Sequence, residues 1–186
     1  MSLSSREAAQ SLSQAESASR RSAELYVYHR SSPHLIMWGI IWVFGYGGTG
    51  LTPENANLIW GILTAIGLAG GIVIGRCTPK DTVKGSFRAW RLAALFAIII
   101  FFVSATYTVM EPHLAKQFCA FPALITGTAY AAVGLWAGTR YVVAGIAVLA
   151  LTLFGFFYLT PHLYFFWMAL VGGGAMILAG LWFRTV

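Results

Sequence analysis

Charged residues are scarce in this sequence. Only 10% of its 186 residues are Asp, Glu, Lys or Arg, whereas 58% are hydrophobic. A water-soluble domain of this length needs more polar surface, so the composition excludes an ordinary soluble protein. The stretch 141–183 has no charged residue at all and is long enough for two membrane crossings.

Cysteine is also rare, with only Cys77 and Cys119 in the chain. Two cysteines without metal-ligand or redox spacing exclude a disulfide framework and a cysteine-based metal cluster. The topology derived below places them at opposite faces of the membrane. We therefore expect no disulfide between them.

Signatures of catalysis are absent. The chain contains no Gly-x-Ser-x-Gly, no His-Glu-x-x-His, no phosphate-binding loop and no Asp-rich pair. We therefore expect neither an enzyme nor a bound cofactor.

Acidic residues are missing from the middle of every apolar run. All six lie in polar segments or at the ends of these runs: Glu7, Glu16, Glu24, Glu54, Asp81 and Glu111. This distribution argues against a proton pump or carboxylate-driven transport, which need ionisable groups inside the membrane. A facilitator stays open, with a path lined by Ser104, Thr106, Tyr107, Thr126, Thr128 and Tyr130.

Six uncharged runs have roughly the 20 residues that a helix needs to cross a bilayer. They are 35–51, 57–75, 92–110, 118–137, 141–159 and 163–183. Each must be helical, because unpaired backbone groups are costly in hydrocarbon. The sequence therefore predicts an all-α integral membrane protein. A bundle of six transmembrane helices occupies 33–186, after a short, polar, cytoplasmic N-terminal segment, 1–32, which can form a helix.

Prolines mark the expected helix starts. Thr52 before Pro53 can cap the second helix, and the pairs at 32–33, 111–112 and 160–161 follow the same pattern. Four glycines crowd the far end of the first span, at Gly45, Gly47, Gly48 and Gly50. Because glycine weakens a helix, we expect this end to unwind.

Basic residues predict the orientation. Of the 12 Lys and Arg residues, only Lys116 falls on one side of the six-span arrangement. The other 11 share the opposite side: Arg6, Arg20, Arg21, Arg30, Arg76, Lys80, Lys84, Arg88, Arg91, Arg140 and Arg184. Positive loops stay in the cytoplasm, so both termini are expected there, in the inner (plasma) membrane of a bacterium. The net charge of +6 is thus a topology signal, and we expect no nucleic-acid partner.

Small residues recur at four-residue intervals in two spans. Gly67, Gly71 and Gly75 stack on one face of the second span, and Ala123, Gly127 and Ala131 do so in the fourth. Such stripes let helices approach closely. The stripes are consistent with helix packing within one chain and with self-association of two chains, and the sequence does not distinguish these two roles.

Histidines suggest a metal hypothesis. The tripeptide Pro-His-Leu occurs three times at the start of a span, and two copies place His113 and His162 on the outer face. Imidazoles with Met110, Glu111 and Cys119 could ligate copper or haem iron. The alternative, which we favour, is that these histidines only tolerate a half-wet boundary.

Three functions remain open. The favoured one is a non-enzymatic regulatory, assembly or sensory module that acts through partners, either a second copy or another membrane protein. The second is a small-solute transporter or channel, and the third is a metal- or haem-binding membrane protein. In every case the lipid bilayer is a partner.

Overall fold

The structure is a computed structural model that describes residues 5–77 and 89–185. Every secondary-structure element in these ranges is a helix, which confirms the predicted all-α class. In chain order the elements are α1 (Ser5–Leu51), η1 (Pro53–Asn55), α2 (Ala56–Cys77), α3 (Ala89–Met110), α4 (Ala115–Ala137), α5 (Thr139–Tyr158), α6 (Pro161–Trp167), η2 (Met168–Gly173) and α7 (Gly174–Phe183). η1 is a 3-10 turn, and η2 is a π-helical segment that joins α6 to α7.

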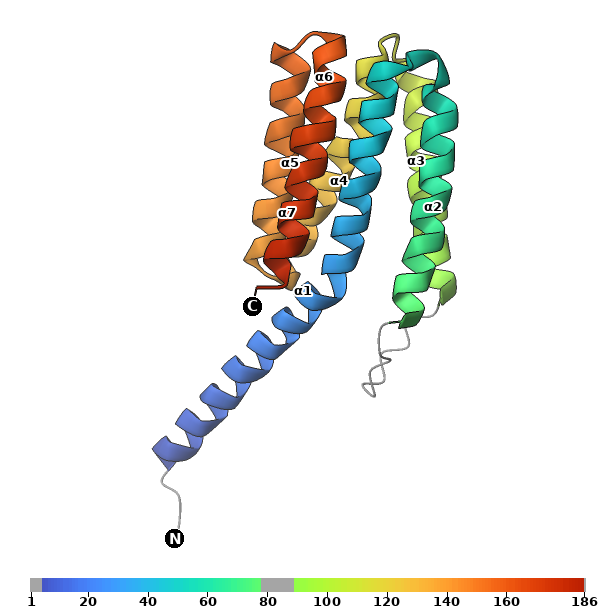
Figure 1. Cartoon of the computed structure of the whole chain (residues 1–186). Coiled ribbons are helices and arrows are strands. Elements are labelled where there is room, and N and C mark those ends of the chain that lie inside the picture. Colours follow the sequence, from blue (N-terminus) through green and yellow to red (C-terminus); the bar gives the residue numbers. More distant parts are fainter. Residues whose placement is uncertain (1–4, 78–88, 186) are drawn as a thin grey trace.

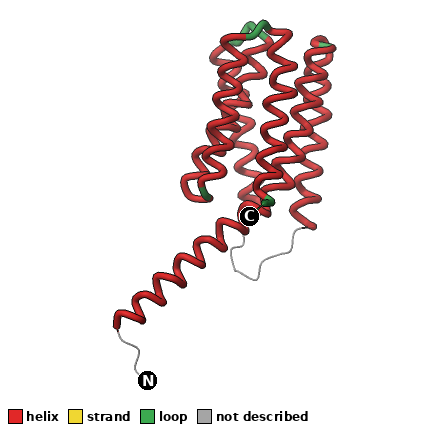
Figure 2. Tube along the Cα trace, turned by 60° about the vertical axis from the view of Figure 1, so that its left-hand side comes forward, coloured by secondary structure: helices red, strands yellow, loops and turns green. Residues whose placement is uncertain are grey.

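The helices run side by side, and α1 extends far beyond the others (Figure 1). Both termini lie at that end, which we call the termini end; it contains Arg140 and Arg184. The connections from α1 to α2, α3 to α4 and α5 to α6 lie at the opposite end, which we call the hairpin end. The rotated view in Figure 2 shows the same arrangement.

Within the described residues, four helical segments are long and apolar enough to cross a membrane. They are Pro53–Cys77, Ala115–Ala137, Thr139–Tyr158 and Pro161–Phe183, and Ala97–Met110 is a shorter apolar helix. These segments support a membrane protein with several transmembrane helices. The count of six spans stays a prediction, with the expected spans 35–51 and 92–110 lying in α1 and α3.

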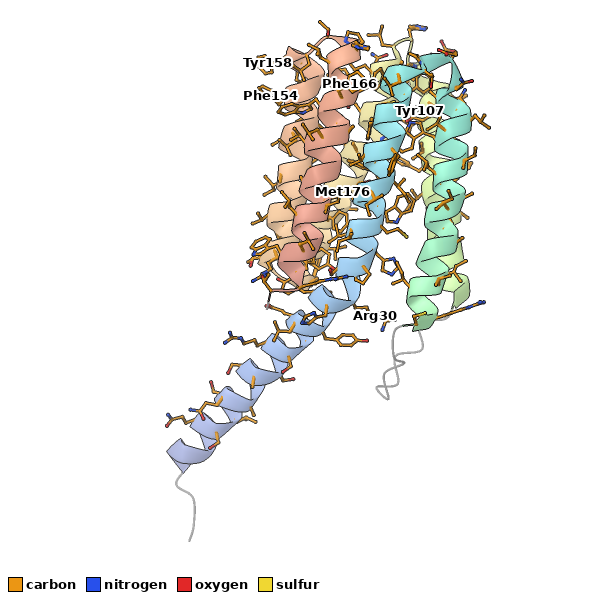
Figure 3. The ribbon with its side chains drawn as sticks, viewed as in Figure 1. Arg30, Tyr107, Phe154, Tyr158, Phe166 and Met176 are labelled. Atoms are coloured by element: carbon orange, nitrogen blue, oxygen red, sulfur yellow. The ribbon has the colours of Figure 1, made fainter. Side chains whose placement is uncertain are left out.

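Two expectations for the first span are wrong. The helix does not begin at Pro33 but runs through it, and it stays helical to Leu51 despite the glycines. α1 changes direction near Arg30, where it leaves the bundle (Figure 3), as a proline inside a helix commonly causes. Three of these glycines serve close packing, because a Cβ would lie 2.8 Å from Trp60 at Gly45, 3.1 Å from Ile59 at Gly48 and 3.2 Å from Phe166 at Gly50. This packing outweighs the low helix propensity of glycine.

The expected helix starts differ in their outcome. Thr52 does not cap α2, because its hydroxyl donates to the Gly48 carbonyl at 3.1 Å instead. The start expected at Glu111 and Pro112 is also wrong, since Glu111 has a φ of 41° and α4 begins only at Ala115. The start at Pro161 is confirmed.

α1 packs most closely against α7 and η2. A Cβ on Gly39 would lie 2.9 Å from the Gly173 carbonyl, so the two backbones touch at this crossing. Nearer the termini end, the buried Ser32 hydroxyl donates to the Gly180 carbonyl at 2.6 Å. α1 is therefore joined to the C-terminal helix by both backbone contact and a buried hydrogen bond.

α2 and α3 are covered far less by the rest of the chain. Gly67 is the one buried residue in α2 among those described. In α3, Phe101 is 75% exposed and Val109 is 80% exposed. Such large apolar surfaces are stable when they face lipid, so these two helices lie at the periphery of the more tightly packed helices.

Candidate functional site

Pro122 in α4 leaves one carbonyl of its own helix without a helical hydrogen bond. Proline has no N–H, so the carbonyl of Phe118, four residues earlier, loses its helical hydrogen bond. The Tyr107 hydroxyl of α3 donates to this carbonyl at 2.6 Å. The Tyr107 ring also lies 5.0 Å from the Phe118 ring and 5.5 Å from the Phe121 ring. A proline in one helix thus provides the polar attachment point for its neighbour.

A second tyrosine bonds the next carbonyl of α4. Tyr46 in α1 is buried, and its hydroxyl donates to the Cys119 carbonyl at 2.8 Å. Its ring packs edge-on against Trp42 and Trp60, with centroid distances of 5.5 and 5.0 Å. Tyr46 therefore connects α1, α2 and α4 in one aromatic and polar cluster.

A short hydrogen-bond chain continues from α2 into α1. The indole N–H of Trp60 donates to the Thr49 hydroxyl at 3.1 Å, and Thr49 donates to the Gly45 carbonyl at 2.8 Å. Thr49 is buried, so this chain satisfies polar groups away from water. It fixes the Trp60 indole across the glycine-rich part of α1.

These residues surround a cavity of about 680 Å³ between α1, α2, α3 and α4. Figure 3 labels Tyr107, which lies toward the hairpin end of this region. The lining residues carry no charged side chain, and they are Trp42, Tyr46, Thr49, Pro53, Ala56, Asn57, Trp60, Thr64, Tyr107, Ala115, Phe118, Cys119 and Pro122. The walls are aromatic with a few hydroxyl and amide groups, which is the usual composition of a site for a small neutral molecule.

One buried hydroxyl beside the cavity lacks a partner within the part of the chain that the structure describes. Tyr164 of α6 is fully buried, and its hydroxyl makes no hydrogen bond there. Tyr164 has no exposed surface and is not among the residues that line the cavity, so its hydroxyl is an unsatisfied polar group inside the helix packing.

Lys116, the single basic residue assigned to the hairpin side, has a structural task. Its ammonium group donates to the Leu159 carbonyl at 2.7 Å, at the C-terminal end of α5. It also lies 5.1 Å from the centre of the Phe156 ring and 5.7 Å from that of Tyr164. A cation is favourable at a helix C-terminus and above aromatic rings, so Lys116 stabilises the packing of α4 against the end of α5 and the Tyr164 ring.

The glycines predicted for packing in α2 have unequal surroundings. A Cβ on Gly67 would lie 2.8 Å from the Trp38 ring of α1, so α1 and α2 approach closely there. At Gly71 the nearest atom would be His34 at 3.9 Å, and at Gly75 no atom lies within 4 Å. The close approach is thus limited to one of the three positions, and the role of the stripe as a whole stays a prediction.

The stripe of α4 lies against α5. Ala123 is fully buried, and a Cβ on Gly127 would lie 2.8 Å from the Leu149 side chain. Across the same interface, a Cβ on Gly145 would collide with the backbone nitrogen of Ala131. Ala123, Gly127 and Ala131 therefore lie in a region of close packing within the chain.

The two histidines of the metal hypothesis are exposed at the hairpin end. The His113 amide donates to the Gln117 side chain at 3.1 Å, and the His162 ring packs edge-on against Phe166. Within residues 5–77 and 89–185, no three His, Cys, Asp or Glu side chains are close enough to hold a metal ion. The structure therefore gives the metal hypothesis no ligand cluster.

Sequence reasoning named two lining residues of the cavity as functional candidates, Tyr107 for a solute path and Cys119 for a metal site. It missed Tyr46, Trp60 and Thr49, because their significance depends on how α1 and α2 meet. The available signal was Pro122 inside a predicted span, since a proline there releases a carbonyl that a neighbouring helix must satisfy.

Comparison with known protein families, with curated proteins and with solved structures finds no match to this chain.

Proposed function

We propose that this protein is a non-enzymatic sensory or regulatory module of the bacterial inner membrane. It crosses the membrane six times, binds a small neutral molecule in the cavity near the hairpin end, and acts on a protein partner at the termini end. The observation that carries this proposal is the continuity of α1. This single helix of 47 residues lines the cavity with Trp42, Tyr46 and Thr49 and also projects beyond the bundle (Figure 1).

The chemistry of the lining residues supports a neutral ligand. A charged molecule would find no countercharge on the cavity wall and would lose its hydration. A molecule with a flat apolar part can pack on Trp42 and Trp60, and its polar atoms can contact Asn57 and Thr64.

In this proposal, ligand binding affects the partner through a movement of α1. Tyr46 of α1 donates a hydrogen bond to α4, and Trp60 of α2 donates one to α1. An occupant that displaces either ring therefore also displaces α1. Most described residues of α1 before Tyr28 are exposed, which leaves that part of the helix available to another protein. A ligand shifts the equilibrium between two positions of α1 only by the difference between its binding free energies for those positions.

The distribution of charge supports the orientation. Arg76, Arg140 and Arg184 lie at helix ends on the side of the termini, whereas Lys116 lies at the hairpin end. The predicted positions of Lys80, Lys84 and Arg88 lie outside the described residues. With six spans, the excess of positive charge on this side supports a cytoplasmic location for both termini.

Copurification of the full chain in a mild detergent tests the partner role. Leu12 is 63% exposed on the projecting part of α1, and Leu12→Glu should release a partner that the wild type retains. Gln14→Glu introduces the same charge on the same exposed part and is the control. Absence of any retained protein from the wild type, or equal loss in both variants, contradicts the proposal.

A transporter is the second candidate, because a cavity of about 680 Å³ with hydroxyl groups also suits the passage of a neutral solute. Flux of neutral solutes into proteoliposomes tests it. Flux that Tyr46→Trp blocks by filling the cavity would favour transport over sensing.

A further inference from the structure

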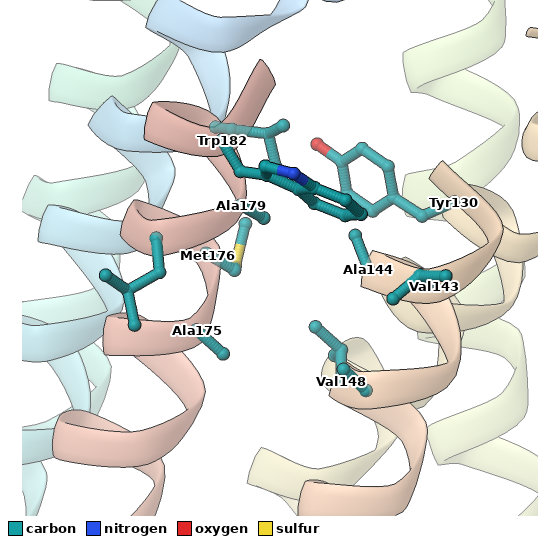
Figure 4. A pocket seen from close by; sticks show the side chains of 11 residues that line it. Tyr130, Val143, Ala144, Val148, Ala175, Met176, Ala179 and Trp182 are labelled. Carbon is teal, nitrogen blue, oxygen red and sulfur yellow. The ribbon is translucent and has the colours of Figure 1, made fainter. Parts of the chain in front are cut away.

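A second hollow lies away from the cavity, between α5 and α7. It has a volume of about 350 Å³ and a lining of apolar and aromatic side chains. Small residues on both helices leave this space open, namely Ala144 and Ala147 on α5 and Ala175 and Ala179 on α7. Figure 4 shows these two helices on either side of the hollow, with the Trp182 indole reaching from α7 toward Tyr130. We call this hollow the α5–α7 groove.

Arg140 is fixed at the end of this groove. Its side chain donates from Nη1 to the Trp182 carbonyl, and the same nitrogen lies 3.3 Å from the Thr185 hydroxyl. The guanidinium carbon is 4.6 Å from the centre of the Trp182 ring and 5.7 Å from that of Tyr28. Two aromatic rings and two hydrogen bonds thus hold the charge beside the residue that closes the groove.

No carboxylate neutralises this charge within the part of the chain that the structure describes. Arg184, the other arginine at this end, donates from Nε to the Ser32 hydroxyl at 2.9 Å. Glu24 lies beside Gly138, and no ion pair joins a described acid to Arg140. Two arginines at a membrane boundary without a carboxylate partner favour the binding of an anion.

We infer that the α5–α7 groove binds one acidic phospholipid of the leaflet at the termini end. An acyl chain occupies the groove over the alanines, and the phosphate accepts hydrogen bonds from Arg140. The apolar lining matches a hydrocarbon chain, and the arginine matches a phosphate. This site is separate from the ligand cavity near the hairpin end, so it does not depend on the proposed function.

The test is native mass spectrometry of the delipidated full chain, titrated with phosphatidylglycerol or phosphatidylcholine. The wild type should bind one phosphatidylglycerol about tenfold more tightly than phosphatidylcholine, because a charge-assisted hydrogen bond distinguishes the two headgroups. Arg140→Gln should remove this preference, and Arg140→Lys should keep most of it.

Two further variants test whether the acyl chain occupies the α5–α7 groove. Ala147→Leu places a larger side chain in the groove and should weaken binding of phosphatidylglycerol. Ala150→Leu, on the exposed side of the same helix, is the control and should leave binding unchanged. Melting curves of Ala147→Leu and Ala150→Leu should coincide with that of the wild type, and binding by every variant is measured well below its melting temperature, which separates lost binding from lost folding.

Several results would overturn the inference. Equal affinity of the wild type for both lipids would exclude recognition of the headgroup charge. Full binding by Ala147→Leu, or equal loss in Ala147→Leu and Ala150→Leu, would place the lipid outside the groove. Competition by inorganic phosphate as strong as that by the lipid would show that the acyl chain contributes nothing.

Discussion

The hydrogen bond from Tyr107 to the Phe118 carbonyl should exist only because residue 122 is a proline. In Tyr107→Phe the carbonyl keeps neither its helical partner nor the tyrosine hydroxyl. An unsatisfied buried group costs about 1–3 kcal/mol in water-soluble proteins, but interhelical hydrogen bonds in membranes average about 0.6 kcal/mol. We therefore expect Tyr107→Phe to lower the free energy of unfolding by about 1 kcal/mol.

A double-mutant cycle separates this bond from other effects of the lost hydroxyl. Pro122→Ala restores a backbone N–H that can bond the Phe118 carbonyl, so Tyr107→Phe should cost almost nothing in that background. The assay is reversible unfolding of the four proteins with sodium dodecyl sulfate. Tyr158→Phe, at an exposed position of α5, is the control and should be neutral. An equal loss of unfolding free energy on Tyr107→Phe in the wild-type and Pro122→Ala backgrounds would refute the reasoning.

Three further predictions concern close helix packing, a buried hydrogen bond and the two exposed histidines. Gly145→Leu should cost more than about 3 kcal/mol by forcing apart α4 and α5, whereas Gly174→Leu, with open space at its Cβ, should be mild; unfolding curves compare them. Ser32→Ala should lower the melting temperature by about 2–4 °C, because it removes the donor to the Gly180 carbonyl and an acceptor for an arginine. His113→Gln and His162→Gln should leave the metal content and visible absorbance of the purified protein unchanged; a metal or haem band lost in either variant would contradict this.

The helical class followed from the sequence because the physics of the bilayer allows few alternatives. Long uncharged runs in lipid must be helical, so the runs that became α4, α5 and α6–α7 were evident without tertiary information. Predictions of helix ends failed where a contact between distant residues decided the outcome. α1 stays helical through its glycines because side chains of α2 and α6 pack closely against Gly45, Gly48 and Gly50, and no local propensity contains those contacts.

The cavity was less predictable for the same reason. Aromatic residues such as Tyr46 and Trp60 occur throughout the spans, and the sequence does not indicate which of them will meet. Pro122 was the one local clue, since its missing N–H requires a donor from another helix. The identity of that donor, Tyr107, depends on the position of α3 beside α4.

Labelling of the two native cysteines tests the central claim most directly, because Cys77 lies at the end of α2 near the termini end and Cys119 lines the cavity near the hairpin end. A small, membrane-impermeant thiol reagent is applied to intact cells and to inside-out vesicles. Our account predicts that Cys77 reacts only from the cytoplasmic side, whereas Cys119 reacts more slowly and only from the outer side. Reaction of both cysteines from the same side would contradict the six-span arrangement and the position of the cavity within it.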